Sequence, residues 1–129
     1  MLRAPVVSAV AVGGALGAVG RYGAGSALGG SAVGTIVVNL SGCLLIGVLT
    51  VLVGEVWAGH RLLRPFLGTG VLGGYTTFSG YALDAQRLIV DGRPGAALAY
   101  LLGTVAGALL AVQLGIVLAR ALALRRRST

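Results

Sequence analysis

Charged residues are scarce in this chain, and their scarcity indicates the solvent in which it folds. Only 10% of the 129 residues are charged, whereas soluble domains carry about 25%. Hydrophobic residues make up 57% of the chain, which excludes an intrinsically disordered protein. Proline is rare, with 3 residues, so the 23 glycines do not form a collagen-like repeat. These shortages leave an integral membrane protein whose glycines serve close contacts between helices.

Acidic, histidine and cysteine side chains, which carry most enzyme and metal chemistry, are nearly absent. The chain holds 3 acidic residues, 1 histidine and 1 cysteine. Cys43 alone cannot form an intrachain disulfide, and we interpret it as an apolar packing residue. His60 has no second histidine or cysteine at ligand spacing, so a transition-metal site is not expected. No serine, histidine and aspartate set supports nucleophilic catalysis, and we predict that the protein is not an enzyme.

Long stretches without charge are present instead, and there are four of them. A transmembrane helix needs about 20 apolar residues, and the runs do not alternate as the strands of a membrane barrel do. We therefore predict an all-α integral membrane protein, with residues 1–129 forming a single four-helix transmembrane domain. The expected helices run over about 5–25, 33–53, 62–90 and 95–120.

The third predicted helix carries poor helix formers at its centre. Residues 68–80 read Gly-Thr-Gly-Val-Leu-Gly-Gly-Tyr-Thr-Thr-Phe-Ser-Gly, in which paired glycines precede hydroxyl and aromatic residues. Backbone groups released at membrane depth must bond to protein, ions or water, and transporters place ion sites at broken helices. We predict that this helix is broken mid-membrane, with a kinked helix packed through its glycines as the alternative.

All 10 basic residues are arginine, and they are distributed unequally between the two sides of the membrane. In a four-span topology, three of them (Arg21, Arg87 and Arg93) face one side and seven face the side of both termini. The positive-inside rule then places the termini in the cytoplasm. We interpret the cluster at 125–127 as an anchor at anionic lipid. The net charge of +7 therefore does not imply a nucleic-acid partner.

Neutral hydrogen-bonding side chains, rather than acids, occupy the predicted spans. Amide and hydroxyl groups donate hydrogen bonds without a fixed charge, so they are suited to replacing the water around a small anion. Hydrogen bonding between helices is the alternative role. The candidates are Asn39, Thr35, Ser41, Thr76, Thr77, Ser79, Tyr100 and Thr104.

Two aromatic residues and one acid complete the candidate site. Phe78 and Tyr81 are three residues apart and share a helix face. Ring edges carry partial positive charge, so an anion can approach them, although simple packing is the alternative. Asp84 lies near the end of the third helix and is the sole candidate for the embedded carboxylate that proton-coupled antiporters need.

Three segments resemble the CrcB/Fluc fluoride channel family, in order and over nearly the whole chain. They are 13–22 (GGALGAVGRY), 34–43 (GTIVVNLSGC) and 68–81 (GTGVLGGYTTFSGY). The resemblance implies a passive fluoride channel that exports cytoplasmic fluoride across a bacterial plasma membrane and so reduces its toxicity. It also implies an antiparallel dimer with two pores and a structural Na⁺ at the interface.

The resemblance further implies roles for particular residues. The backbone carbonyls of Gly73 and Thr76 would hold the Na⁺. Two positions depart from the family, because Tyr81 replaces a phenylalanine and Ala108 replaces a hydroxyl residue, and we expect either change to weaken one pore. With the polar cluster, the predicted pore-lining set comprises Asn39, Phe78, Tyr81, Thr35, Tyr100, Thr104, Ser79 and Arg21.

The arginine distribution bears on the partner within that dimer. An antiparallel homodimer needs the same chain inserted both ways, which a weak arginine bias favours. Because some organisms of this family carry two paired genes, we hypothesise pairing with an oppositely oriented homologue rather than with itself. A non-conducting subunit of such a heteromer and a small multidrug or guanidinium exporter are alternative functions. The exporter class needs an acid deep in its first helix, which this chain lacks.

Overall fold

The structure, a computed structural model, describes residues 3–57 and 59–128. Within these ranges every regular element is helical, in agreement with the predicted all-α class. The elements are α1 (Ala4–Ala27), α2 (Ala32–Val51), the π-helical turn η1 (Leu52–Val56), the π-helical segment η2 (Pro65–Leu72), the short α3 (Gly73–Tyr75), α4 (Phe78–Val90) and α5 (Pro94–Arg127).

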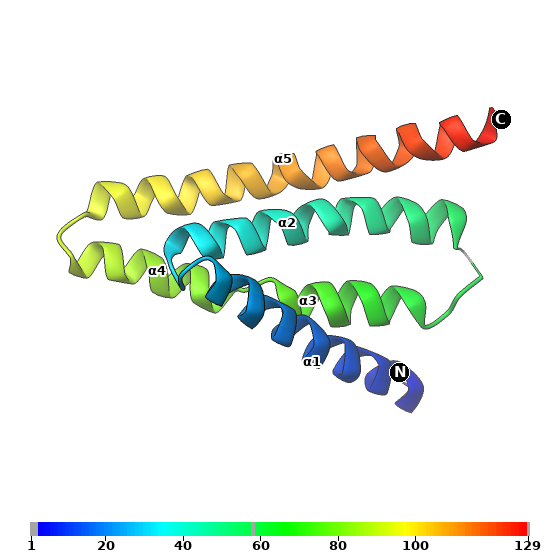
Figure 1. Ribbon diagram of the computed structural model, residues 1–129, viewed down its shortest axis with the longest axis horizontal. Coiled ribbons are helices and arrows are strands. Elements are labelled where there is room, and N and C mark those ends of the chain that lie inside the picture. The colour runs from blue at the N-terminus through cyan, green and yellow to red at the C-terminus, as the bar shows by residue number, and fades with distance from the viewer. Residues whose placement is uncertain (1–2, 58, 129) are drawn as a thin grey trace.

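The helices form an elongated bundle, and successive connections between helices lie toward opposite ends of the bundle. α5 runs beside α2, while α1 packs across η2 and α3 (Figure 1). Both ends of the chain and the η1–η2 connection lie toward one end of the bundle, and the α4–α5 turn lies at the other (Figure 1). The segments that carry the seven arginines are thereby gathered at one end.

Three helices in the described part of the chain are long and apolar enough to cross a membrane. They are Ala4–Ala27, Ala32–Val56 and Pro94–Arg127. Large apolar side chains on these helices are exposed, such as Val19, Leu102 and Leu110. A surface of this kind is suited to lipid rather than water. The chain is therefore a multi-pass membrane protein.

The last helix is longer than the sequence predicts. It covers Pro94–Arg127, whereas the prediction of 95–120 ends with the charge-free run. Arginine, leucine and alanine all propagate a helix well, and arginine near a helix C-terminus interacts favourably with the helix dipole. The loss of apolar character at Arg120 therefore does not end the helix, and α5 projects beyond its neighbours (Figure 1).

Glycine allows the helix backbones to touch in two places. Gly17 on α1 lies against the Val71 carbonyl of η2, and Gly115 on α5 lies against the Leu44 carbonyl of α2. A Cβ atom at either position would collide with main-chain atoms, which cannot rotate away. Gly103, also on α5, has open space where a Cβ would lie.

This difference predicts unequal effects of two substitutions in the same helix. Gly115→Val should destabilise the protein by about 1–3 kcal/mol, because overpacking forces α2 and α5 apart. Gly103→Val should have little effect and serves as the matched control. Thermal unfolding of the purified protein in detergent measures both, and equal midpoints for the two variants would contradict the packing argument.

Candidate functional site

An interruption between α3 and α4 forms the centre of the candidate site. Thr76 and Thr77 are both extended, with φ/ψ of −78°/158° and −142°/124°. The Thr76 N–H still donates to the Leu72 carbonyl at 3.0 Å. The Thr77 N–H leaves the helix and donates to Oδ1 of Asn39 at 2.8 Å. The Gly73 carbonyl, which would accept from Thr77 in a continuous helix, is thereby released.

Asn39 on α2 clamps this extended segment with both ends of its amide. Oδ1 accepts from the Thr77 N–H, and Nδ2 donates to the Thr77 carbonyl at 2.9 Å. These two bonds replace the helical bonds that the interruption removes, which an apolar environment requires. Nδ2 carries two N–H groups, so one of them is left to donate to a ligand. The sequence indicated a polar donor here but not its hold on the backbone.

Arg21 on α1 binds the carbonyl end of the first half of the interrupted helix. Its Nη1 donates to the carbonyls of Gly74 at 2.9 Å and Thr76 at 3.1 Å. The C-terminal end of a helix favours a cation, because unpaired carbonyls accumulate there. Arg21, Asn39 and the released carbonyls come from three helices, so the interruption is held by tertiary contacts rather than by its own sequence.

The hydroxyl groups at the interruption bond locally. Thr76 donates to the Leu72 carbonyl at 3.0 Å, and Thr77 accepts from the Gly80 N–H at 3.0 Å as the N-cap of α4. The Ser79 hydroxyl lies 3.3 Å from that of Thr77. These bonds favour a structural role for this cluster. They also fix the N-terminus of α4, whose positive dipole end attracts anions.

A contact between α2 and α3 was not predicted from the sequence. The hydroxyls of Ser41 and Tyr75 are 2.9 Å apart. Gly42 lies beneath them, where a Cβ would collide with the Thr76 side chain. Gly42 follows Asn39 by three residues and therefore shares its helix face. From this spacing, the sequence could have indicated a surface of α2 without side chains, against which the interrupted helix packs.

Three aromatic rings lie in series from the interruption toward α5. The ring centroids of Phe78 and Tyr81 are 5.9 Å apart, and those of Tyr81 and Tyr100 are 5.4 Å apart. Phe78 is 78% exposed at one end of the series. At the other end the Tyr100 hydroxyl donates to Oδ2 of buried Asp84 at 3.1 Å. The structure therefore brings together the predicted aromatic pair and the predicted Tyr100.

Thr104 lies one helical turn after Tyr100 and has unused hydrogen-bonding capacity. It is 8% exposed, and within the described residues its hydroxyl oxygen has no hydrogen-bond partner. A buried hydroxyl without a partner is destabilising, and it keeps its capacity to donate and accept hydrogen bonds. Thr35 lies in the first turn of α2, where its N–H donates to the Ser31 carbonyl at 3.2 Å. The predicted polar positions Tyr100 and Thr104 thus adjoin the aromatic series.

The released carbonyls have the chemistry of a site for a hard cation. Uncharged backbone oxygens at a broken helix are typical ligands of Na⁺ in membrane proteins. The Gly73 carbonyl is released by the interruption, and the residue is exposed. The Thr76 carbonyl accepts one hydrogen bond from Arg21, which leaves its second lone pair. Both predicted carbonyl oxygens are therefore chemically suited to be ligands of Na⁺.

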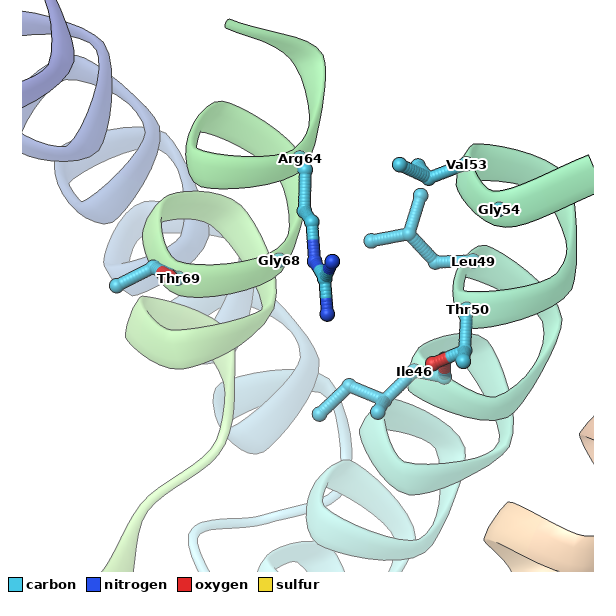
Figure 2. Close-up of a pocket in the computed structure, with 8 residues that line it drawn as sticks. All are labelled: Ile46, Leu49, Thr50, Val53, Gly54, Arg64, Gly68 and Thr69. Carbon is cyan, nitrogen blue, oxygen red and sulfur yellow. The ribbon is translucent and has the colours of Figure 1, made fainter. Parts of the chain in front are cut away.

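A separate cleft of about 480 Å³ opens between α2 and η2. Ile46 and Leu49 contribute an apolar wall, and the Arg64 side chain extends into the space between the helices (Figure 2). None of the predicted site residues lines this cleft. Its lining residues come from α2, η1 and η2 and from Arg64, on the side of the η1–η2 connection.

An interrupted helix, held by polar groups within a bundle of helices apolar enough to cross a membrane, is typical of multi-pass proteins that transport ions. The family follows from comparison with known sequences. The profile described as CrcB-like protein, Camphor Resistance (CrcB), matches residues 8–116, and the chain belongs to this family. The resemblance inferred from the three sequence motifs is thereby confirmed.

Several curated relatives carry a functional name. Fluoride-specific ion channel FluC 2 of Streptomyces avermitilis is 52% identical over 106 residues, covering 79% of this chain and 67% of the relative. FluC 1 of Streptomyces coelicolor is 52% identical over 116 residues, covering 87% and 75%. FluC of Paracoccus denitrificans is 46% identical over 117 residues, covering 88% and 93%. These relatives are named as ion channels rather than as enzymes.

Proposed function

We propose that this protein is a passive, fluoride-selective channel that exports cytoplasmic fluoride and so reduces fluoride toxicity. The observation that carries the proposal is the clamped interruption at Thr76 and Thr77, in a chain about half identical to proteins named as fluoride-specific channels. The alternative of a multidrug or guanidinium exporter has no comparable support.

The channel is completed by a second subunit packed antiparallel, with the interruption at the middle of the membrane. Phe78 and Gly73 are both exposed beside the interruption. The released carbonyl of Gly73 supports this arrangement, because an unpaired backbone carbonyl is a poor surface to present to lipid. A second copy, or a homologue with the same motif, would cover them.

The path for the anion follows the donors that the monomer leaves open. Fluoride would meet the free N–H of Asn39 and the N-terminus of α4, then the ring edges of Phe78 and Tyr81. The ring of Tyr100, whose hydroxyl proton is donated to Asp84, and the hydroxyl of Thr104 would continue the path. Such a narrow, rigid lining replaces the hydration of a small anion and excludes chloride, which is larger.

No energy source is required for export. Fluoride enters cells as neutral HF from acidic surroundings and is trapped inside as the anion. A membrane potential that is negative inside favours exit of one negative charge by about 2.3 kcal/mol per 100 mV. A passive pore with sufficient selectivity therefore lowers the internal fluoride concentration.

A Na⁺ ion between the subunits would be held by the carbonyls of Gly73 and Thr76 from each copy. When bound, the ion would coordinate carbonyl oxygens that accept no hydrogen bond within the helix. Arg21 holds the Thr76 carbonyl in position and Asn39 keeps the Thr77 N–H away from Gly73, so that these oxygens stay open. The role of the ion is structural.

Reconstitution of the purified chain into liposomes tests the function. Vesicles loaded with potassium fluoride should release fluoride when a potassium ionophore relieves the charge imbalance, and vesicles without protein should not. Potassium chloride-loaded vesicles should retain their anion. Absence of fluoride release from correctly folded protein, alone and with its paired homologue, would contradict the channel function.

The partner is a separate question, and the seven-to-three arginine distribution favours an oppositely oriented homologue. This chain would insert into a bacterial plasma membrane with both termini on the cytoplasmic side. A tag at the C-terminus should be inaccessible from outside in nearly all copies. Equal accessibility from both sides would instead support a homodimer. Fluoride release only after co-expression with the homologue would identify this chain as a subunit that does not conduct alone.

A further inference from the structure

We propose that Tyr81 is a positioning residue, whose hydroxyl tethers α4 to α5 and holds the ring edge toward the anion path. This inference rests on the proposed channel function. The Tyr81 hydroxyl donates to the backbone carbonyl of Leu101 at 2.6 Å. This bond joins residues 20 positions apart, on two different helices.

The hydrogen bond removes the hydroxyl from the anion path. A tyrosine hydroxyl has one proton to donate, and here that proton is given to α5. The Leu101 carbonyl lies inside a helix, and its second lone pair accepts the additional bond. An anion alongside the ring therefore meets carbon-bound hydrogens, as it would beside phenylalanine.

The tether also fixes the orientation of the ring. Tyr81 packs at 29° to the plane of Tyr100 and at 50° to that of Phe78. Packing alone leaves the ring able to tilt, whereas a hydrogen bond at its far end defines its direction. Tyr100 is held in the same way by Asp84. Two anchored rings thus form a rigid wall on the side of α5.

Because of this tether, we expect the tyrosine at position 81 to support the pore, whereas the family resemblance alone led us to expect that it weakens one. The hydroxyl does not obstruct the path, and the tether increases the rigidity on which selection between anions depends. The expected consequence of losing it is a channel that still conducts fluoride but discriminates less well against chloride.

Tyr81→Phe tests the tether, with Tyr22→Phe as the matched control. Tyr22 is 78% exposed on α1, and the same oxygen atom is removed there. Tyr81→Phe should lower the thermal midpoint in detergent by about 3 °C relative to Tyr22→Phe, as expected for the loss of one hydrogen bond. The ratio of chloride efflux to fluoride efflux should rise about threefold or more relative to Tyr22→Phe.

Two results would overturn the proposal. A hydroxyl that binds fluoride directly predicts that Tyr81→Phe lowers fluoride efflux about tenfold or more with an unchanged midpoint. Variants that are indistinguishable in midpoint and in selectivity would show that the tether has no effect. The midpoint comparison does not depend on conduction, so it tests the tether even if the wild-type chain transports no fluoride.

Discussion

Replacing Phe78 by isoleucine is expected to abolish fluoride efflux from proteoliposomes while leaving the subunit folded. The ring stands 78% exposed at the N-terminus of α4, so its loss removes little packing within the subunit. Isoleucine keeps the apolar character but has no ring edge with partial positive charge. A loss of about 3 kcal/mol in stabilisation of the anion in the path would lower the rate more than 100-fold.

Tyr22→Ile is the matched control for this experiment. Tyr22 has the same exposed fraction of 78%, but it lies on α1 and outside the aromatic series. This variant should conduct fluoride as the wild type does. Both variants should elute as dimers with unchanged helix content. Efflux at the wild-type rate from a correctly assembled Phe78→Ile protein would remove Phe78 from the path.

Local sequence patterns predicted the helices and an interruption near the pair Gly73-Gly74, whereas these glycines are helical and the extended residues are Thr76 and Thr77. Charge-free runs bounded by charged residues define spans in lipid, and poor helix formers mark where helix propensity fails. These signals lie within one turn or one span of the feature that they predict. The extension of α5 to Arg127 was not predicted, because hydropathy indicates where the membrane boundary lies and not where the helix ends.

The contacts that hold the interruption could not be predicted in this way. Asn39 and Thr77 are 38 residues apart, and Arg21 and Thr76 are 55 residues apart. Their pairing depends on how α1, α2 and α3 pack, which no local pattern encodes. The direction of the Tyr81 hydroxyl likewise depends on α5. The sequence indicated polar candidates without their contacts, whereas the structure distinguishes those bound to backbone from Thr104, whose hydroxyl has no partner among the described residues.

Asn39→Asp is expected to impair conduction and stability together. The carboxylate can still accept from the Thr77 N–H, but it has no proton to donate to the Thr77 carbonyl. That carbonyl then faces a second acceptor instead of a donor, at a cost of about 1–3 kcal/mol. The negative charge also lies beside the proposed anion path. We expect fluoride efflux to fall at least about 100-fold, which corresponds to about 2.7 kcal/mol.

Gln86→Glu separates the effect of the clamp from the effect of the charge. Gln86 is exposed near the C-terminal end of α4, and this variant makes the same change from amide to acid away from the interruption. It should retain fluoride efflux. The midpoint of Asn39→Asp should also approach that of wild type in acid, because a protonated carboxyl regains an O–H donor for the Thr77 carbonyl. An Asn39→Asp protein with wild-type efflux would exclude Asn39 as an anion donor. If the thermal midpoint of Asn39→Asp is lowered equally at every pH, the bond to the Thr77 carbonyl is not the source of the stability that Asn39 provides.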